Sequence, residues 1–153
     1  MKLSALYQIF LDCQSVTTDS RNCPDGSLFI ALKGESFNGN AFAKLALDSG
    51  CAFAIIDEIQ YAIEGDQRYI LVDDCLQTMQ QLANYHRRQL GTRVIGITGT
   101  NGKTTTKELI SSVLCQNHNV LYTLGNLNNH IGVPTTLLRL KPEHDLAVIE
   151  MGA

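Results

Sequence analysis

Short apolar runs separated by polar turns fill the first half of the chain, a pattern typical of an α/β domain. A short helix is predicted near the start from apolar residues at helical spacing, namely Leu3, Leu6, Tyr7 and Phe10. Apolar runs predict strands over residues 28–32, 52–56 and 69–72. Strands that alternate with helices in this way indicate a parallel sheet.

Two further helices are predicted between these strands. Asn40 is expected to cap the first, which carries Phe42, Leu45 and Ala46 and ends before Gly50. Asp73 or Asp74 is expected to cap the second, which ends before Gly91. The apolar stripe of this longer helix consists of Leu76, Met79, Ala83 and Leu90.

The second half repeats the strand–helix alternation. Residues 94–98 predict a buried strand, and a glycine-bearing turn then leads into a helix whose apolar positions are Ile110, Val113 and Leu114. Strands are predicted over 120–123 and 146–149, with a short helical run after Pro134. We therefore expect two α/β domains, residues 1–90 and residues 91–153.

The composition argues against several classes of protein. The 153 residues carry 12 basic and 15 acidic side chains, a net charge of −3, so neither a basic nucleic-acid arm nor a nucleic-acid partner is expected. The five cysteines lack the spacing of a zinc site, and their odd number argues against a disulfide framework. No signal peptide or membrane-length apolar run is seen, which predicts a cytoplasmic protein without a membrane partner. His86, His118 and His144 are expected to be solvated.

A glycine-bearing loop between a predicted strand and a predicted helix carries the strongest chemical signal. It consists of Gly99, Thr100, Asn101, Gly102, Lys103, Thr104 and Thr105. Such a loop directs backbone N–H groups and a helix N-terminus at one anion. Lys103 would neutralise phosphate charge and the Thr104 hydroxyl would bind Mg²⁺. The strict phosphate-loop pattern has a glycine where this chain has Ile97, and the alternative is a structural turn followed by an unrelated Lys–Thr pair.

A carboxylate supports the phosphate-site interpretation. Four apolar residues, Leu146 to Ile149, place Glu150 at the carboxyl end of a strand, which is the edge where ligands bind in parallel sheets. Glu150 is therefore a candidate Mg²⁺ ligand, although it could simply end the strand. The chain has no Asn-Lys-x-Asp guanine-reading motif, so ATP is favoured over GTP.

The loop from Gly99 to Thr105 resembles the shortened ATP loop of the Mur ligases, which build peptidoglycan precursors. Three segments of the first half, residues 18–21, 24–29 and 31–35, resemble the uridine-nucleotide end of that family. Residues 125–134 with 136–138 resemble a segment distinctive of the last amide-forming ligase of the series. Where many relatives have Asp-Gly-His, this chain has Asn38, Gly39 and Asn40.

The resemblance implies a fold, an activity and a set of sites. It implies a small α/β uridine-nucleotide domain followed by the first part of a phosphate-loop ATPase domain with a parallel sheet, with the rest of a longer enzyme missing. The implied reaction joins D-Ala-D-Ala to UDP-N-acetylmuramoyl-tripeptide with ATP and Mg²⁺, in a monomer. Substrate contacts would come from Ser20, Arg21, Asn40, Asn126, Asn128 and Asn129, and Lys103 would be catalytic.

Several alternatives remain at this point. Arg21 could instead be a surface residue that pairs with Asp19 or Asp25, and the asparagines could make ordinary loop hydrogen bonds. The chain could also resemble the preceding ligase of the series, which adds a single amino acid. From another class, it could be a nucleotide-binding module without catalytic activity.

Overall fold

The structure is a computed structural model that describes residues 2–152. The chain divides into two compact units, Met1–Leu82 and Ala83–Ala153. Helix α3 (Cys75–Leu90) begins in the first unit and ends in the second, so the division falls inside a helix. The domain boundary expected after residue 90 lies at the end of this helix, eight residues beyond the last residue of the first compact unit, Leu82, and stays a prediction.

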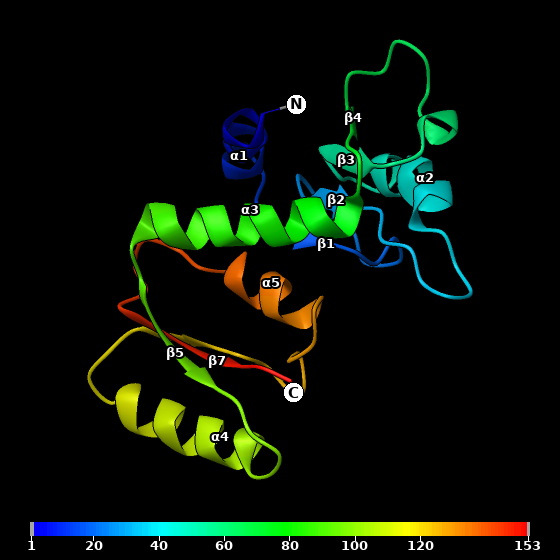
Figure 1. The fold of residues 1–153 in the computed structure, drawn as a ribbon. Coiled ribbons are helices and arrows are strands. Elements are labelled where there is room, and N and C mark those ends of the chain that lie inside the picture. The colour runs from blue at the N-terminus through cyan, green and yellow to red at the C-terminus, as the bar shows by residue number, and fades with distance from the viewer. Residues whose placement is uncertain (1, 153) are drawn as a thin grey trace. The chain divides into compact units, whose positions relative to one another are not determined.

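Unit 1 is built around a four-stranded parallel sheet with the order β1-β2-β3-β4 (Figure 1). The strands are β1 (Val16–Thr17), β2 (Leu28–Ile30), β3 (Phe53–Ile56) and β4 (Tyr69–Leu71). Its other elements are α1 (Leu3–Asp12), the 3₁₀ helix η1 (Gly39–Phe42), α2 (Ala43–Asp48), the 3₁₀ helix η2 (Ile59–Tyr61) and the start of α3. The predicted α/β organisation with a parallel sheet is confirmed.

The core of unit 1 follows from strand position. The two central strands, β2 and β3, are flanked on both sides, and their residues Leu28, Ile30, Ile55 and Ile56 are completely inaccessible to solvent. Helix α1 buries the predicted apolar face through Leu6, Tyr7 and Phe10. Asp74 rather than Asp73 caps α3, because its Oδ1 accepts a 2.7 Å hydrogen bond from the Gln77 amide.

The predicted helix after Asn40 differs from the observed one in its cap and in its buried face. The cap is Asn38, whose side chain accepts from the Asn40 amide and starts the 3₁₀ helix η1. The following helix, α2, buries Ala43, Ala46 and Leu47, while Phe42 and Leu45 are 44% and 50% exposed. The 3₁₀ turn contains fewer residues per turn than an α-helix, so it shifts the register of the apolar face.

Unit 2 contains a three-stranded parallel sheet with the order β5-β7-β6. Its strands are β5 (Arg93–Ile97), β6 (Val120–Tyr122) and β7 (Leu146–Glu150), and its helices are the end of α3, α4 (Lys103–Leu114) and α5 (Gly132–Leu137). Helix α4 covers one face, and α5 lies over the other (Figure 1).

The central strand β7 explains how this unit packs. Side chains alternate across a strand, so Leu146 and Val148 pack with residues of α4, whereas Ala147 and Ile149 face the opposite cluster around Leu140. All five residues of β7 are buried. By the same alternation, Glu150 lies on the face of the sheet that α4 covers.

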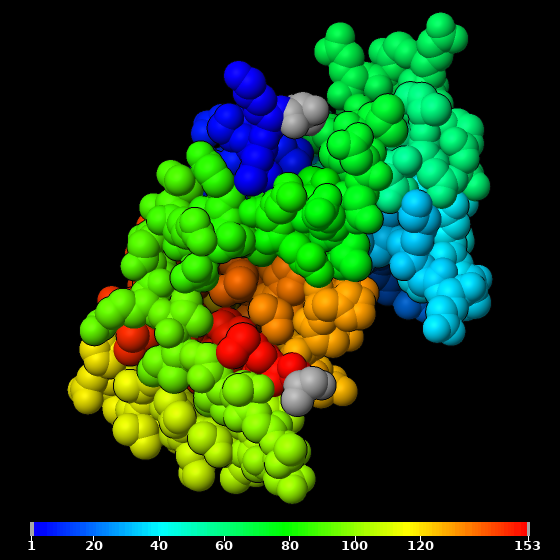
Figure 2. All heavy atoms as spheres, viewed as in Figure 1, coloured from blue at the N-terminus to red at the C-terminus, as the bar shows by residue number. Residues whose placement is uncertain are grey.

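Three predictions for residues of unit 2 were wrong. Strand β5 was expected to be buried, but it is at the edge of the described sheet and its residues are exposed or half-buried. Val113 was expected in the apolar stripe of α4, yet it is 68% exposed, and Leu109 is 63% exposed. Figure 2 shows the yellow-green atoms of this helix region at the outer surface. His86 was expected to be solvated, but it is buried and its Nε2 lies 2.9 Å from the Leu140 carbonyl oxygen.

The described residues include no helix that is both long enough and apolar enough to span a bilayer.

Candidate functional site

The loop between β5 and α4 has the backbone shape of an anion-binding turn. Gly99 and Gly102 have φ values of 140° and 77°, which side-chain-bearing residues rarely adopt, so glycine is required at both positions. Gly102 immediately precedes the 12-residue helix α4, whose first N–H groups lack partners within the helix. The geometry therefore suits a phosphate group at the start of α4.

Most residues of this loop are exposed to solvent. Gly99, Thr100, Asn101, Gly102, Thr104 and Thr105 are exposed, and Lys103 is half-buried. The Lys103 ammonium group donates to the Gly99 carbonyl, so the side chain folds back across its own loop. A ligand bound in the loop would meet this ammonium directly.

Glu150 reaches the loop because of strand register. It pairs in register with Ile97, the last residue of β5, which places its carboxylate beside the start of the phosphate loop. The Glu150 side chain is 1% exposed, and its Oε1 accepts from Thr104 Oγ1 at 3.2 Å and from Asn128 Nδ2 at 2.8 Å. Its Oε2 accepts no hydrogen bond from the described residues. The two predicted metal ligands, Thr104 and Glu150, are thus brought into contact.

The asparagine-rich segment also lies at this end of the sheet. Asn128 is half-buried and orients Glu150, while its backbone carbonyl accepts from the Gly152 amide at 2.6 Å. Asn129 is exposed, and its Oδ1 accepts from the amides of Ile131 and Gly132, at 3.1 and 2.7 Å, which caps the start of α5. Asn126 is exposed to solvent.

In unit 1, the candidate uridine-site residues follow the carboxyl ends of the parallel strands. Ser20 and Arg21 come after β1; Ser20 is half-buried, and Arg21 is exposed. Arg21 forms a bidentate ion pair with Asp19, with Nε–Oδ1 and Nη2–Oδ2 distances of 2.9 and 2.8 Å. These hydrogen bonds lower the pKa of Asp19 to about 2. Arg21 therefore makes the surface ion pair with Asp19 that the sequence offered as an alternative. A ligand phosphate would compete with the Asp19 carboxylate for Arg21.

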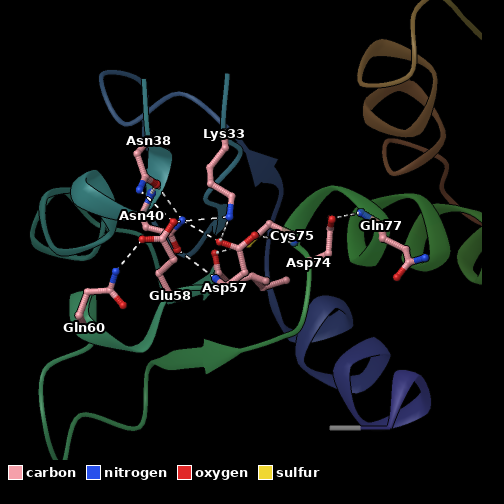
Figure 3. A network of polar contacts seen from close by, with 10 residues as sticks. Lys33, Asn38, Asn40, Asp57, Glu58, Gln60, Asp74, Cys75 and Gln77 are labelled. Carbon is pink, nitrogen blue, oxygen red and sulfur yellow. Dashed lines mark hydrogen bonds and ion pairs between the residues drawn. The ribbon is translucent and has the colours of Figure 1, made fainter. Parts of the chain in front are cut away.

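Asn40 is the centre of a buried polar network (Figure 3). Its Nδ2 donates to Asp57 Oδ1 at 2.8 Å and to Asn38 Oδ1 at 2.9 Å, and its Oδ1 accepts from the Asp57 amide at 3.0 Å. The residue is 1% exposed. Its amide group is therefore used within the fold, and its predicted contact with a substrate stays a prediction.

Asp57 joins this network to helix α3. Its Oδ2 accepts from the Cys75 amide at 3.2 Å, and its Oδ1 lies 3.1 Å from Lys33 Nζ. Burial alone would raise the pKa of Asp57, but hydrogen bonds from Asn40 and the Cys75 amide and the charge of Lys33 lower it overall. The carboxylate thus stays ionised and holds three chain segments together at one edge of the sheet.

Both halves of the chain match known protein families. Residues 12–87 match the Mur ligase family, catalytic domain, and residues 97–153 match the Mur ligase middle domain. The chain belongs to the Mur ligase family. The two matches lie on the two halves of the chain that carry the polar network around Asn40 and the phosphate loop.

Among relatives, the UDP-N-acetylmuramoyl-tripeptide–D-alanyl-D-alanine ligase of Bacillus subtilis is 47% identical over 90% of this chain. A crystal structure of MurF from Acinetobacter baumannii covers 99% of the chain with a TM-score of 0.85 and 36% identity. The MurF ligase of Thermotoga maritima, solved in complex with ADP, covers 94% with a TM-score of 0.81 and 30% identity. The chain spans 30% of the Bacillus relative and 36% and 33% of the two solved chains.

Sequence reasoning on this Mur ligase chain missed Lys107. This lysine of α4 is completely buried, with its Nζ 3.2 Å from the Gly125 carbonyl oxygen and 3.9 Å from Glu150 Oε2. A signal was present, because Lys107 lies three residues after Thr104 and four before the buried Ser111, on the inward face of the helix. A lysine on such a face requires a partner within the fold.

Proposed function

We propose that this chain supplies the uridine-substrate domain and the phosphate-binding part of an ATP-dependent ligase that joins D-Ala-D-Ala to UDP-N-acetylmuramoyl-tripeptide. The observation that carries the proposal is the contact between Thr104 of the phosphate loop and the buried carboxylate of Glu150. The choice of substrates is supported by the relatives in Bacillus subtilis and Escherichia coli, which are UDP-N-acetylmuramoyl-tripeptide–D-alanyl-D-alanine ligases. The free cysteines and the nucleotide substrates support a cytoplasmic location, and we propose that the protein acts as a monomer.

The chemistry requires activation of a carboxylate, because a carboxylate does not acylate an amine at neutral pH. The γ-phosphoryl group of ATP is transferred to the tripeptide carboxylate, so the bond to ADP breaks and an acyl phosphate forms. The amine of D-Ala-D-Ala then attacks the acyl carbon, phosphate leaves, and the amine nitrogen loses a proton. Two anions must approach each other in the first step, and cationic and N–H groups must offset their repulsion.

The residues of the loop match that task. The N–H groups at the start of α4 and the Lys103 ammonium are proposed to bind the phosphates, where they would act on the charge that spreads during transfer. Gly99, Thr100, Asn101, Gly102 and Thr105 complete the proposed ATP contacts. The lysine would leave its contact with the Gly99 carbonyl to bind phosphate oxygens.

Mg²⁺ fits the residues at this site. The described residues contain no group of three His, Cys, Asp or Glu side chains that would hold a metal alone, which agrees with an ion held partly by phosphate oxygens. Glu150 has a carboxylate oxygen, Oε2, that no donor among the described residues 2–152 hydrogen-bonds, and the Thr104 hydroxyl is adjacent. Bound there, Mg²⁺ would neutralise phosphate charge during transfer. Asn128 would hold the carboxylate in place.

Substrate binding completes the proposal. Ser20, Arg21 and Asn40 at the strand ends of unit 1 are proposed for the uridine nucleotide, with Arg21 exchanging Asp19 for a phosphate oxygen. Asn126 and Asn129 are proposed to orient phosphate or peptide groups, because they are uncharged and exposed at the carboxyl end of the second sheet.

The test uses a hybrid in which residues 1–153 replace the matching 30% of the Bacillus subtilis relative. Phosphate release should require ATP, UDP-N-acetylmuramoyl-tripeptide and D-Ala-D-Ala together. Release with a single amino acid in place of the dipeptide would indicate the preceding ligase of the series. In parallel, the 153-residue chain is titrated with ADP and UDP. Binding of nucleotide by the chain, with no turnover by a folded hybrid, would instead favour a module without catalytic activity.

A further inference from the structure

Lys107 is a completely buried cation beside the proposed metal site. Its side chain is 0% exposed, although lysine is among the residues least often buried without a partner. It projects from the face of α4 that packs on β7, where its neighbours along the helix include Ile110 and Leu114. Packing alone would be served better by an apolar side chain at this position. The lysine is therefore expected to have an electrostatic role.

Three oxygens surround its ammonium group. Nζ lies 2.8 Å from Glu108 Oε1, 3.2 Å from the Gly125 carbonyl oxygen and 3.9 Å from Glu150 Oε2. Glu108 is on the exposed side of the helix and its charge is shared with solvent, whereas Glu150 is 1% exposed. Lys107 is thus the buried positive charge that faces the buried carboxylate.

Lys107 lies nearer to the Glu150 oxygen that is open to a metal ion. Oε1 of Glu150 already accepts hydrogen bonds from Thr104 and Asn128, whereas Oε2 accepts none from the part of the chain that the structure describes. At 3.9 Å, Lys107 is close enough to compensate the charge of Oε2 but is beyond hydrogen-bond distance. This leaves the oxygen able to bind a cation without first breaking a hydrogen bond.

We propose that Lys107 is a positioning residue whose ammonium group compensates the Glu150 carboxylate in the protein to which no divalent cation is bound. It keeps the buried Glu150 compensated and holds the Gly125 end of the asparagine-rich segment against α4. This role rests on the proposed function only in taking Glu150 as a ligand of Mg²⁺. When a cation binds Oε2, Glu108 and the Gly125 carbonyl remain as partners for Lys107.

The test measures the thermal unfolding of the 153-residue chain with Lys107→Met, in MgCl₂ and in NaCl of equal ionic strength. Removal of one partner of a buried ion pair should lower Tm by more than about 10 °C. Because Mg²⁺ would then supply the missing charge, millimolar MgCl₂ should recover at least about a third of this loss. The same salt should change the Tm of the unsubstituted chain by less than about 2 °C.

A second variant separates charge compensation from packing. Lys107→Met combined with Glu150→Gln removes both charges, so Tm should return towards that of the unsubstituted chain and the effect of MgCl₂ should disappear. The matched control is Lys141→Met, an exposed lysine of the same unit, whose Tm should change by less than about 2 °C. If Lys107→Met fails to fold, folding of the double variant alone supports the compensation.

Three results would overturn the proposal. Failure of Glu150→Gln to rescue Lys107→Met would show that the lysine acts through packing. Rescue by Glu150→Gln but not by MgCl₂ would show that the metal does not replace the lysine charge. An equal rise in Tm with MgCl₂ for Lys107→Met and for Lys107→Met combined with Glu150→Gln would show that Mg²⁺ binds at a site other than Glu150. None of these readouts requires ligation, so a hybrid enzyme that makes no product would contradict the proposed function and leave this coupling to be judged by its own result.

Discussion

Replacing Asn40 by alanine should destabilise unit 1 strongly, because the Asn40 side chain is part of the fold. The substitution removes three hydrogen bonds of 2.8, 2.9 and 3.0 Å, of which the shortest is made to the ionised Asp57 carboxylate. A hydrogen bond to a charged group contributes about 1.5–3 kcal/mol, and each of the others about 0.5–1.5 kcal/mol. The expected loss in the free energy of unfolding is therefore about 2.5–6 kcal/mol, a large part of the stability of a small domain.

Hydrogen exchange and urea unfolding of the 153-residue chain measure this loss. Since 1.4 kcal/mol corresponds to a factor of ten, amides of β2 and β3 that exchange through unfolding should exchange at least about fiftyfold faster in Asn40→Ala. The control is Asn22→Ala, an exposed asparagine of the same unit, which should change stability by less than about 0.5 kcal/mol.

The same variant separates the structural role of Asn40 from a contact with substrate. A loss below about 1 kcal/mol together with a clear weakening of UDP binding would refute the reasoning, because the side chain would then act mainly on the ligand. A large loss of stability would mean that weaker UDP binding in this variant reports on the folding of the site.

Three further variants probe other parts of the molecule. Lys103→Ala should lower ligation by the hybrid tenfold to a thousandfold with little change in Tm, because the ammonium acts on phosphate charge; near-normal turnover would contradict its role. Arg21→Ala should weaken UDP binding at least about tenfold and leave ADP binding unchanged; equal losses would argue against two separate sites. Burial lowers the pKa of His86, although its contact with the Leu140 carbonyl acts in the opposite direction. Its neutral form therefore adds stability above the ordinary value of about 6.5, and this contribution is lost as the pH falls towards the folded pKa. In urea titrations between pH 7 and 5, His86→Gln should lose less stability than the unsubstituted chain; parallel curves would contradict this.

The phosphate loop was predictable from the sequence because its chemistry is local. A glycine before Lys103 and another three residues earlier fix the turn, and both have the positive φ that glycine permits. The place of Glu150 was predictable for a related reason, since a run of four apolar residues sets which end of the strand carries the acid.

Properties that depend on tertiary neighbours were harder to predict. The burial of His86 depends on the Leu140 carbonyl, 54 residues away in the chain, and no local pattern signals that partner. The role of Asn38 as the cap depends on a 3₁₀ turn that the apolar pattern does not reveal. The exposed edge of β5 follows from the strand order, which places β7 in the centre, and sequence alternation does not determine strand order.

The Lys107–Glu150 pair lies between these two cases. Alternation along β7 puts Glu150 on the α4 side of the sheet, and the three-residue step from Thr104 puts Lys107 on the same inward face of the helix. Each periodicity is readable in the sequence, but only the pairing of the two elements shows that the two charges meet, at 3.9 Å. Because neither side chain reaches solvent, the charge of each is stabilised partly by the other, beside the hydrogen bonds that each already makes. A lysine on the inward face of the helix and an acid at the end of the central strand therefore have to be interpreted together.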